Sequence, residues 1–150
     1  MMALDYQIVV DCAEPLTLSR FWAAAMGYEP EDNGALIEHV LAQGLAGEGD
    51  YTVVDGRKAW RTLAVIRHPE DPVHEFTGAG LGRRILFQQV PEPKTVKNRM
   101  HLDLRTAPGE RDAEVARLEG LGAVSVAVVE EPGASHVRMR DPEGNEFDVQ

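Results

Sequence analysis

The sequence predicts an α+β fold built from two βαβββ units in one chain. A strand-then-helix pattern occurs twice, from Gln7 to Gly27 and from His101 to Gly122, over intervals that agree to within one residue. Each helix is followed by short segments rich in β-branched residues, which are typical of antiparallel strands. A unit of this size cannot bury its own sheet, so we expect the two to pair into a curved, mixed β-sheet cup around a shared cavity.

The first unit is expected over residues 5–90. A strand over residues 6–11 is rich in Ile and Val, and Pro15 suits the first turn of the helix that follows. Gly27 is expected to end this helix. The segments RTLAVIRHPE and RRILFQQV are expected to be the later strands of the unit, and an extra helix near residues 35–47 is expected as an insertion between them and the first helix.

The second unit is expected over residues 99–150. Its strand, over residues 101–105, leads into a helix with an apolar stripe that Gly122 terminates. The segment AVSVAVVEEP is β-branched, HVRMRD alternates polar with apolar residues, DPEGN reads as a tight turn, and EFDVQ alternates again. This order gives strand, helix, strand, strand, strand.

Charge and composition exclude several classes of partner. The chain has 25 acidic and 15 basic residues, a net charge of −10, which repels nucleic acid and anionic membranes. No run approaches the roughly 18 apolar residues that a membrane span needs. The N-terminal residues do not resemble a secretory signal or a transit peptide, and the single cysteine, Cys12, cannot form an internal disulfide. We therefore expect a cytoplasmic protein.

Four passages resemble the vicinal oxygen chelate (VOC) superfamily, which contains glyoxalase-like, bleomycin-resistance-like and extradiol-dioxygenase-like proteins. They are VVDCAEPLTLSRFWAAAMGYEP, ILFQQVPEPKTVKNRMHLDLR, ERDAEVARLEGLGA and HVRMRDPEGNEFDV. The resemblance implies a single glyoxalase-like domain that binds a small-molecule ligand. Whether two chains form a homodimer is left undecided, because a chain with two units can close its cup without a partner.

The resemblance also implies a divalent metal held by the first and last strands of each unit. It places Gln7 and His101 on the first strands. Aligning the phenylalanines of ILFQQV and NEFDV places Gln88 and Asp148 on the last strands, with Gln89 as an alternative to Gln88. Only Asp148 of this set carries formal charge, so we expect weak binding of Zn, Ni, Fe or Mn, and a site without metal stays open.

The remaining candidates concern catalysis and ligand contact. Asp148 or Glu146 is expected to serve as the base, Asp103 and Arg105 share the strand face of the histidine, and Trp60 is a candidate cavity wall. The function implied is a metal-dependent lyase or isomerase that acts on a small substrate with adjacent oxygens. The alternative is a metal-independent binding or sequestering protein of the bleomycin-resistance type.

Overall fold

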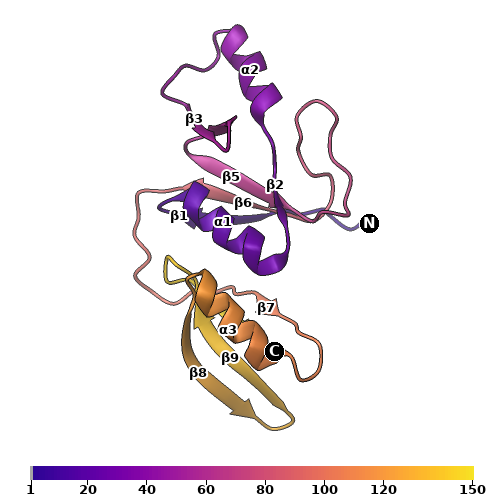
Figure 1. Cartoon of the computed structure of the whole chain (residues 1–150), viewed down its shortest axis with the longest axis vertical. Helices are drawn as coiled ribbons and strands as arrows, with labels where there is room; N and C mark the ends of the chain where they lie inside the picture. The colour runs from indigo at the N-terminus through magenta and orange to yellow at the C-terminus, as the bar shows by residue number, and fades with distance from the viewer. Residues whose placement is uncertain (1) are drawn as a thin grey trace. The chain divides into compact units, whose positions relative to one another are not determined.

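The computed structural model describes residues 2–150. They divide into two compact units, one that ends at Glu92 and one over Pro93–Gln150. Each unit contains a four-stranded mixed sheet and a helix that contacts its strands (Figure 1). This confirms the predicted α+β class. Over the described residues, no helix has both the length and the apolar character that crossing a bilayer requires.

The sheet of the first unit has the strand order β1-β6-β5-β2. β1 runs parallel to β6, and the other pairs are antiparallel. Helix α1 contacts β5 and β6 and begins at a proline, as predicted; Gly27 caps its C-terminus with φ 68°. The elements of this sheet and its helix are β1 (Ile8–Cys12), α1 (Pro15–Met26), β2 (Glu29–Pro30), β5 (Leu63–Arg67) and β6 (Arg84–Gln89).

The sheet of the second unit repeats this topology, with the order β7-β10-β9-β8. Here too the first strand runs parallel to the last, and the last strand lies between the first and the third. The same connectivity in both halves is the βαβββ repeat that the sequence predicts. Its elements are β7 (Asp103–Leu104), α3 (Arg111–Leu121), β8 (Val124–Glu131), β9 (Ala134–Arg140) and β10 (Glu146–Val149).

An insertion lengthens the first unit between β2 and β5. It holds a helix, α2 (Gly34–Ala42), which overlaps the stretch of residues 35–47 where one is expected, followed by a hairpin of β3 (Tyr51–Val54) and β4 (Arg57–Trp60). The hairpin is absent from the sequence-based expectation. Its two turn residues, Asp55 and Gly56, both have positive φ, 50° and 78°, as a tight type I′ connection requires.

Each sheet buries one face. In the first unit this face carries Ile66, Ile85 and Phe87, each at most 4% exposed. In the second unit Phe147 and Val149 are at most 1% exposed, and the alternation of strand side chains sends their neighbours to the other face. That other face, called the open face below, is where the polar residues of β10 lie.

A buried ion pair holds the segment 68–83 against the sheet of the first unit. The Glu31 side chain is 1% exposed and lies 2.8 Å from Nε of Arg84. The same carboxylate accepts a second guanidinium hydrogen bond at 2.9 Å and the backbone N–H of Gly80 at 2.7 Å. Arg84 also donates to the Gln7 side-chain oxygen. Both charges are therefore matched by hydrogen bonds, as their burial demands.

Gly78 in this segment has φ 72°, and a Cβ there would collide with the backbone carbonyl oxygen of Asp32. Gly44 has a nearly identical φ of 71° but nothing within 4 Å of such a Cβ. We expect Gly78→Ala to destabilise the protein by about 1–3 kcal/mol more than Gly44→Ala, since both share the backbone strain and only one adds the clash. Urea unfolding of the two variants measures this difference, and equal losses would contradict the close approach.

Candidate metal centre

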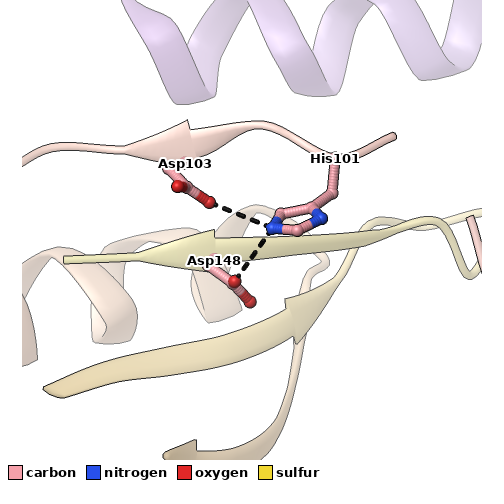
Figure 2. A group of neighbouring side chains, drawn as sticks. All are labelled: His101, Asp103 and Asp148. Carbon is pink, nitrogen blue, oxygen red and sulfur yellow. Dashed lines mark ion pairs between the residues drawn. The ribbon is translucent and has the colours of Figure 1, made fainter. Parts of the chain in front are cut away.

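Three side chains of the second unit converge on its open face. Nε2 of His101 lies 3.2 Å from Oδ1 of Asp103 and 3.2 Å from Oδ2 of Asp148, as Figure 2 shows. One ligand atom from each residue lies within 4.8 Å of the other two. Imidazole nitrogen and carboxylate oxygen are donors that first-row divalent metals bind in proteins. The structure thus brings together His101 and Asp148, and it adds Asp103 as a third donor.

Strand pairing explains this convergence. β7 and β10 are parallel neighbours in which Asp103 lies opposite Asp148. His101 precedes Asp103 by two residues, so both point to the same face of the sheet. Because Phe147 and Val149 point into the core, Asp148 between them points to the open face, where it is nevertheless only 7% exposed. A buried carboxylate needs compensating charge or hydrogen bonds, and its neighbours provide this compensation.

Two further side chains of β9 surround Asp148. Arg138 is its cross-strand partner, with Nε 3.7 Å from Oδ1, and Nε2 of His136 lies 3.5 Å from Oδ2. The sequence-based prediction missed both residues. The signal was present in HVRMRD, whose alternation places His136 and Arg138 on the polar face of one strand, but the sequence does not show which strand lies beside β10.

Glu146 does not suit the expected role of base. Its carboxylate lies 3.0 Å from Nζ of Lys94 and accepts the backbone N–H of Asn98 at 2.9 Å. Burial alone would raise the pKa of Glu146, but these hydrogen bonds outweigh it and hold the pKa at about 2. A carboxylate with so low a pKa is a weak base. Its contacts instead fasten the segment before β7 to β10.

The low pKa of Glu146 predicts a pH dependence of stability. Its folded pKa of about 2 lies below its ordinary value of 4.5, so its contribution is complete above pH 4.5 and is lost as the pH falls toward 2. We expect Glu146→Gln to be less stable than the wild type at pH 7, with the difference shrinking across this window. Urea unfolding at pH 7, 4 and 2.5 measures it; a difference that stays constant would contradict the assignment.

The structure does not bring Gln7 and Gln88 together. Gln7 precedes β1 and its side chain accepts a hydrogen bond from Arg84, at the start of β6. Gln88 lies four residues further along β6, opposite Asp11, an offset of about 13 Å at the rise of a strand. Gln88 and Gln89 are both exposed and alternate to opposite sides of the strand; Gln89 donates to the Ala13 carbonyl oxygen.

The strand registers also show that the two units carry different residues at corresponding places. In the second unit Asp148 lies opposite Asp103, two residues after His101, and in the first unit Gln88 lies opposite Asp11. If Gln88 corresponds to Asp148, the place of the histidine is taken by Val9, which is 48% exposed. The donors therefore concentrate in the second unit.

The two remaining candidates lie on different units. Arg105 follows β7 in the second unit, exposed and on the strand face of His101. Trp60 lies on β4 and lines a pocket of about 110 Å³ within the first unit, together with residues of α1 and β5 such as Leu16 and Leu63. A ligand contact by either remains a prediction.

Comparison with known proteins identifies the family. The chain belongs to the family described as a glyoxalase-like domain, which matches residues 7–150. It is thereby a member of the VOC superfamily, as its sequence resemblance implies. A comparison with curated proteins finds no match.

Solved structures with the same fold include three informative examples, all at low sequence identity. A hypothetical protein from S. aureus is 12% identical with a TM-score of 0.57, covering 99% of this chain and 97% of that one. A variant of the fosfomycin resistance protein FosX from Listeria monocytogenes, complexed with Mn(II) and 1S,2S-dihydroxypropylphosphonic acid, is 11% identical with a TM-score of 0.57, covering 100% and 90%. A glyoxalase/bleomycin resistance protein/dioxygenase family enzyme from Burkholderia phytofirmans PsJN is 14% identical with a TM-score of 0.58, covering 95% and 94%. At these identities the likeness concerns the fold alone.

Proposed function

We propose that this protein is a metal-dependent, glyoxalase-like lyase or isomerase that acts on a small substrate with adjacent oxygens. The observation that carries the proposal is the convergence of His101, Asp103 and Asp148 on one face of one sheet. The donor set fits a divalent metal, because a neutral imidazole with two carboxylates supplies two negative charges where the sequence alone suggested one. Mixed nitrogen and oxygen donors suit Zn, Ni, Fe or Mn better than Mg or Ca.

The residues around the donors suggest how a substrate would be held. A metal bound here would act as a Lewis acid that polarises a substrate oxygen. Arg138, beside Asp148, and Arg105, further along the face of His101, would orient a negatively charged oxygen of the substrate. The FosX complex contains a molecule with two adjacent hydroxyl groups alongside Mn(II), which supports this substrate class. The single cysteine, which cannot form an internal disulfide, supports a cytoplasmic location.

A chelator experiment tests the proposal. Protein without a polyhistidine tag is treated with EDTA, dialysed, and melted with Mn(II), with acetohydroxamate, or with both. We expect Mn(II) to raise the melting temperature, because a ligand that binds only the folded state stabilises it. Acetohydroxamate, which presents two adjacent oxygens, should add a further shift only when Mn(II) is present. His101→Gln should remove both shifts; an unchanged melting temperature of the wild type with Mn(II) and with Zn(II) would refute the metal site.

The alternative function, metal-independent binding of a small molecule, is favoured by one observation. His101 lies between the two carboxylates and Arg138 lies beside Asp148, so both acids already have side-chain partners without a metal. This alternative predicts that a small cationic or aromatic ligand stabilises the protein equally with and without EDTA. The same melting experiment therefore separates the two functions.

A further inference from the structure

Arg138 lies beside the metal cluster without being fastened to it. Its Nε atom is 3.7 Å from Oδ1 of Asp148, which makes an ion pair but is too long for a hydrogen bond. Among residues 2–150 its guanidinium has no hydrogen-bond acceptor, and its side chain is 38% exposed. A guanidinium carries five N–H donors, so those of Arg138 are available to a ligand.

The arginines of the first sheet are held quite differently. Arg83 and Arg84 each donate to a single carboxylate through two nitrogens. On the open face of the second unit, Arg105 and Arg140 are exposed and, like Arg138, have no hydrogen-bond acceptor among the described residues. This face therefore gathers guanidinium groups that the fold itself does not use.

The charges around the cluster indicate what these groups lack. Asp103 and Asp148 together would balance a divalent ion, and Glu146 already has Nζ of Lys94 at 3.0 Å. A bound cation is often the largest charge in its surroundings, so a carboxylate shared with it attracts a neighbouring guanidinium less. In the metal-loaded protein, Arg138 would then carry a positive charge without a partner, next to the place where a substrate binds.

We propose that Arg138 determines substrate specificity by binding an oxyanion of the substrate, a carboxylate or a phosphonate, that is separate from the adjacent oxygens directed at the metal. The inference rests on the proposed function and narrows its substrate class to anionic molecules. The planar guanidinium fork matches the paired oxygens of such groups. Arg138 lies opposite Asp148 on neighbouring strands about 4.8 Å apart, so two methylene groups suffice to join the oxyanion to the oxygens at the metal.

Three hydroxamates with the same metal-binding group test the inference. They carry a carboxylate, a phosphonate or a neutral primary amide at the end of the same chain of two methylene groups. Isothermal titration measures their affinity for the full, untagged chain loaded with Mn(II). We expect the wild type to bind an anionic probe about tenfold to a hundredfold more tightly than the amide, the range for a hydrogen bond to a charged group.

Variants of the arginine assign this preference to one side chain. Arg138→Gln should lose the preference by weakening only the anionic probes, with the affinity for the amide unchanged. Arg138→Lys keeps the charge but not the fork, so it should retain a smaller preference. Arg117→Gln is the matched control, since Arg117 donates to Glu114 on α3, and it should keep the full preference.

The outcomes separate this inference from the proposed function. Equal affinity of the wild type for all three probes would overturn the inference and leave the proposed function standing, because the amide still reports binding at the metal. A preference that survives in Arg138→Gln, or that Arg138→Lys leaves undiminished, would overturn it as well. If the wild type binds neither Mn(II) nor any probe, both fail.

Discussion

Replacing Asp148 by asparagine should weaken Mn(II) binding by at least about a hundredfold, since altering even an outer-shell partner of a metal ligand costs ten- to a hundredfold. Asp148 lies at the centre of the cluster, within 3.2 Å of His101 and 3.5 Å of His136. Asparagine keeps the shape of the side chain but removes one of the two negative charges. Isothermal titration of EDTA-treated protein with Mn(II) measures the change.

The matched control for this prediction is Asp112→Asn. The Asp112 side chain is 88% exposed on α3, so the same chemical change there should leave Mn(II) affinity unaltered. Circular dichroism of both variants checks that the fold is intact. If Asp148→Asn binds Mn(II) as tightly as the wild type, the metal does not sit at this cluster.

Replacing Arg84 by alanine should destabilise the first unit by about 3–5 kcal/mol, the usual cost of stranding one partner of a buried ion pair. The carboxylate left behind, that of Glu31, is 1% exposed and would retain only the backbone N–H of Gly80 among the donors described above. Both tryptophans, Trp22 and Trp60, belong to the first unit. Tryptophan fluorescence during urea unfolding therefore reports on this unit by itself.

A double variant separates the ion pair from the space its side chains fill. Glu31→Leu combined with Arg84→Met removes both charges while keeping much of the volume, so it should be more stable than Arg84→Ala. If instead the single variant unfolds at the wild-type urea concentration, the pair does not hold the segment 68–83 in place. If the single and the double variant lose the same free energy of unfolding, the loss comes from packing and not from the unpaired charge.

The fold could be predicted from the sequence because its signals are local. Pro15 fixes the start of α1, and Gly27 and Gly122 adopt the positive φ that ends a helix. The repetition of this pattern then predicts the βαβββ connectivity that both sheets share. The β3–β4 hairpin was missed although Asp55 and Gly56 form one of the strongest short-range hairpin signals, because the glycines just before it suggested an irregular loop.

The site could be predicted only in part, because it depends on which strands lie side by side. His101 and Asp148 were found from the resemblance, and the parallel pairing of β7 with β10 brings them together. Aligning the phenylalanines made Gln88 of the first unit correspond to Asp148 of the second. The register of β1 and β6 pairs Gln88 with Asp11, however, and leaves Gln7 four residues away along β1. His136 could not be placed beside Asp148 until β9 was known to pair with β10.

We propose above that the second unit holds a divalent metal between His101 and Asp148. The most direct measurement is an anomalous-difference map from crystals of the untagged protein soaked in Mn(II). We expect a peak within about 2.0–2.3 Å of Nε2 of His101 and of a carboxylate oxygen of Asp148, the range for metal bonds to such donors. A map with no peak there at full Mn(II) concentration, and with the imidazole still resting on the two carboxylates, would contradict it.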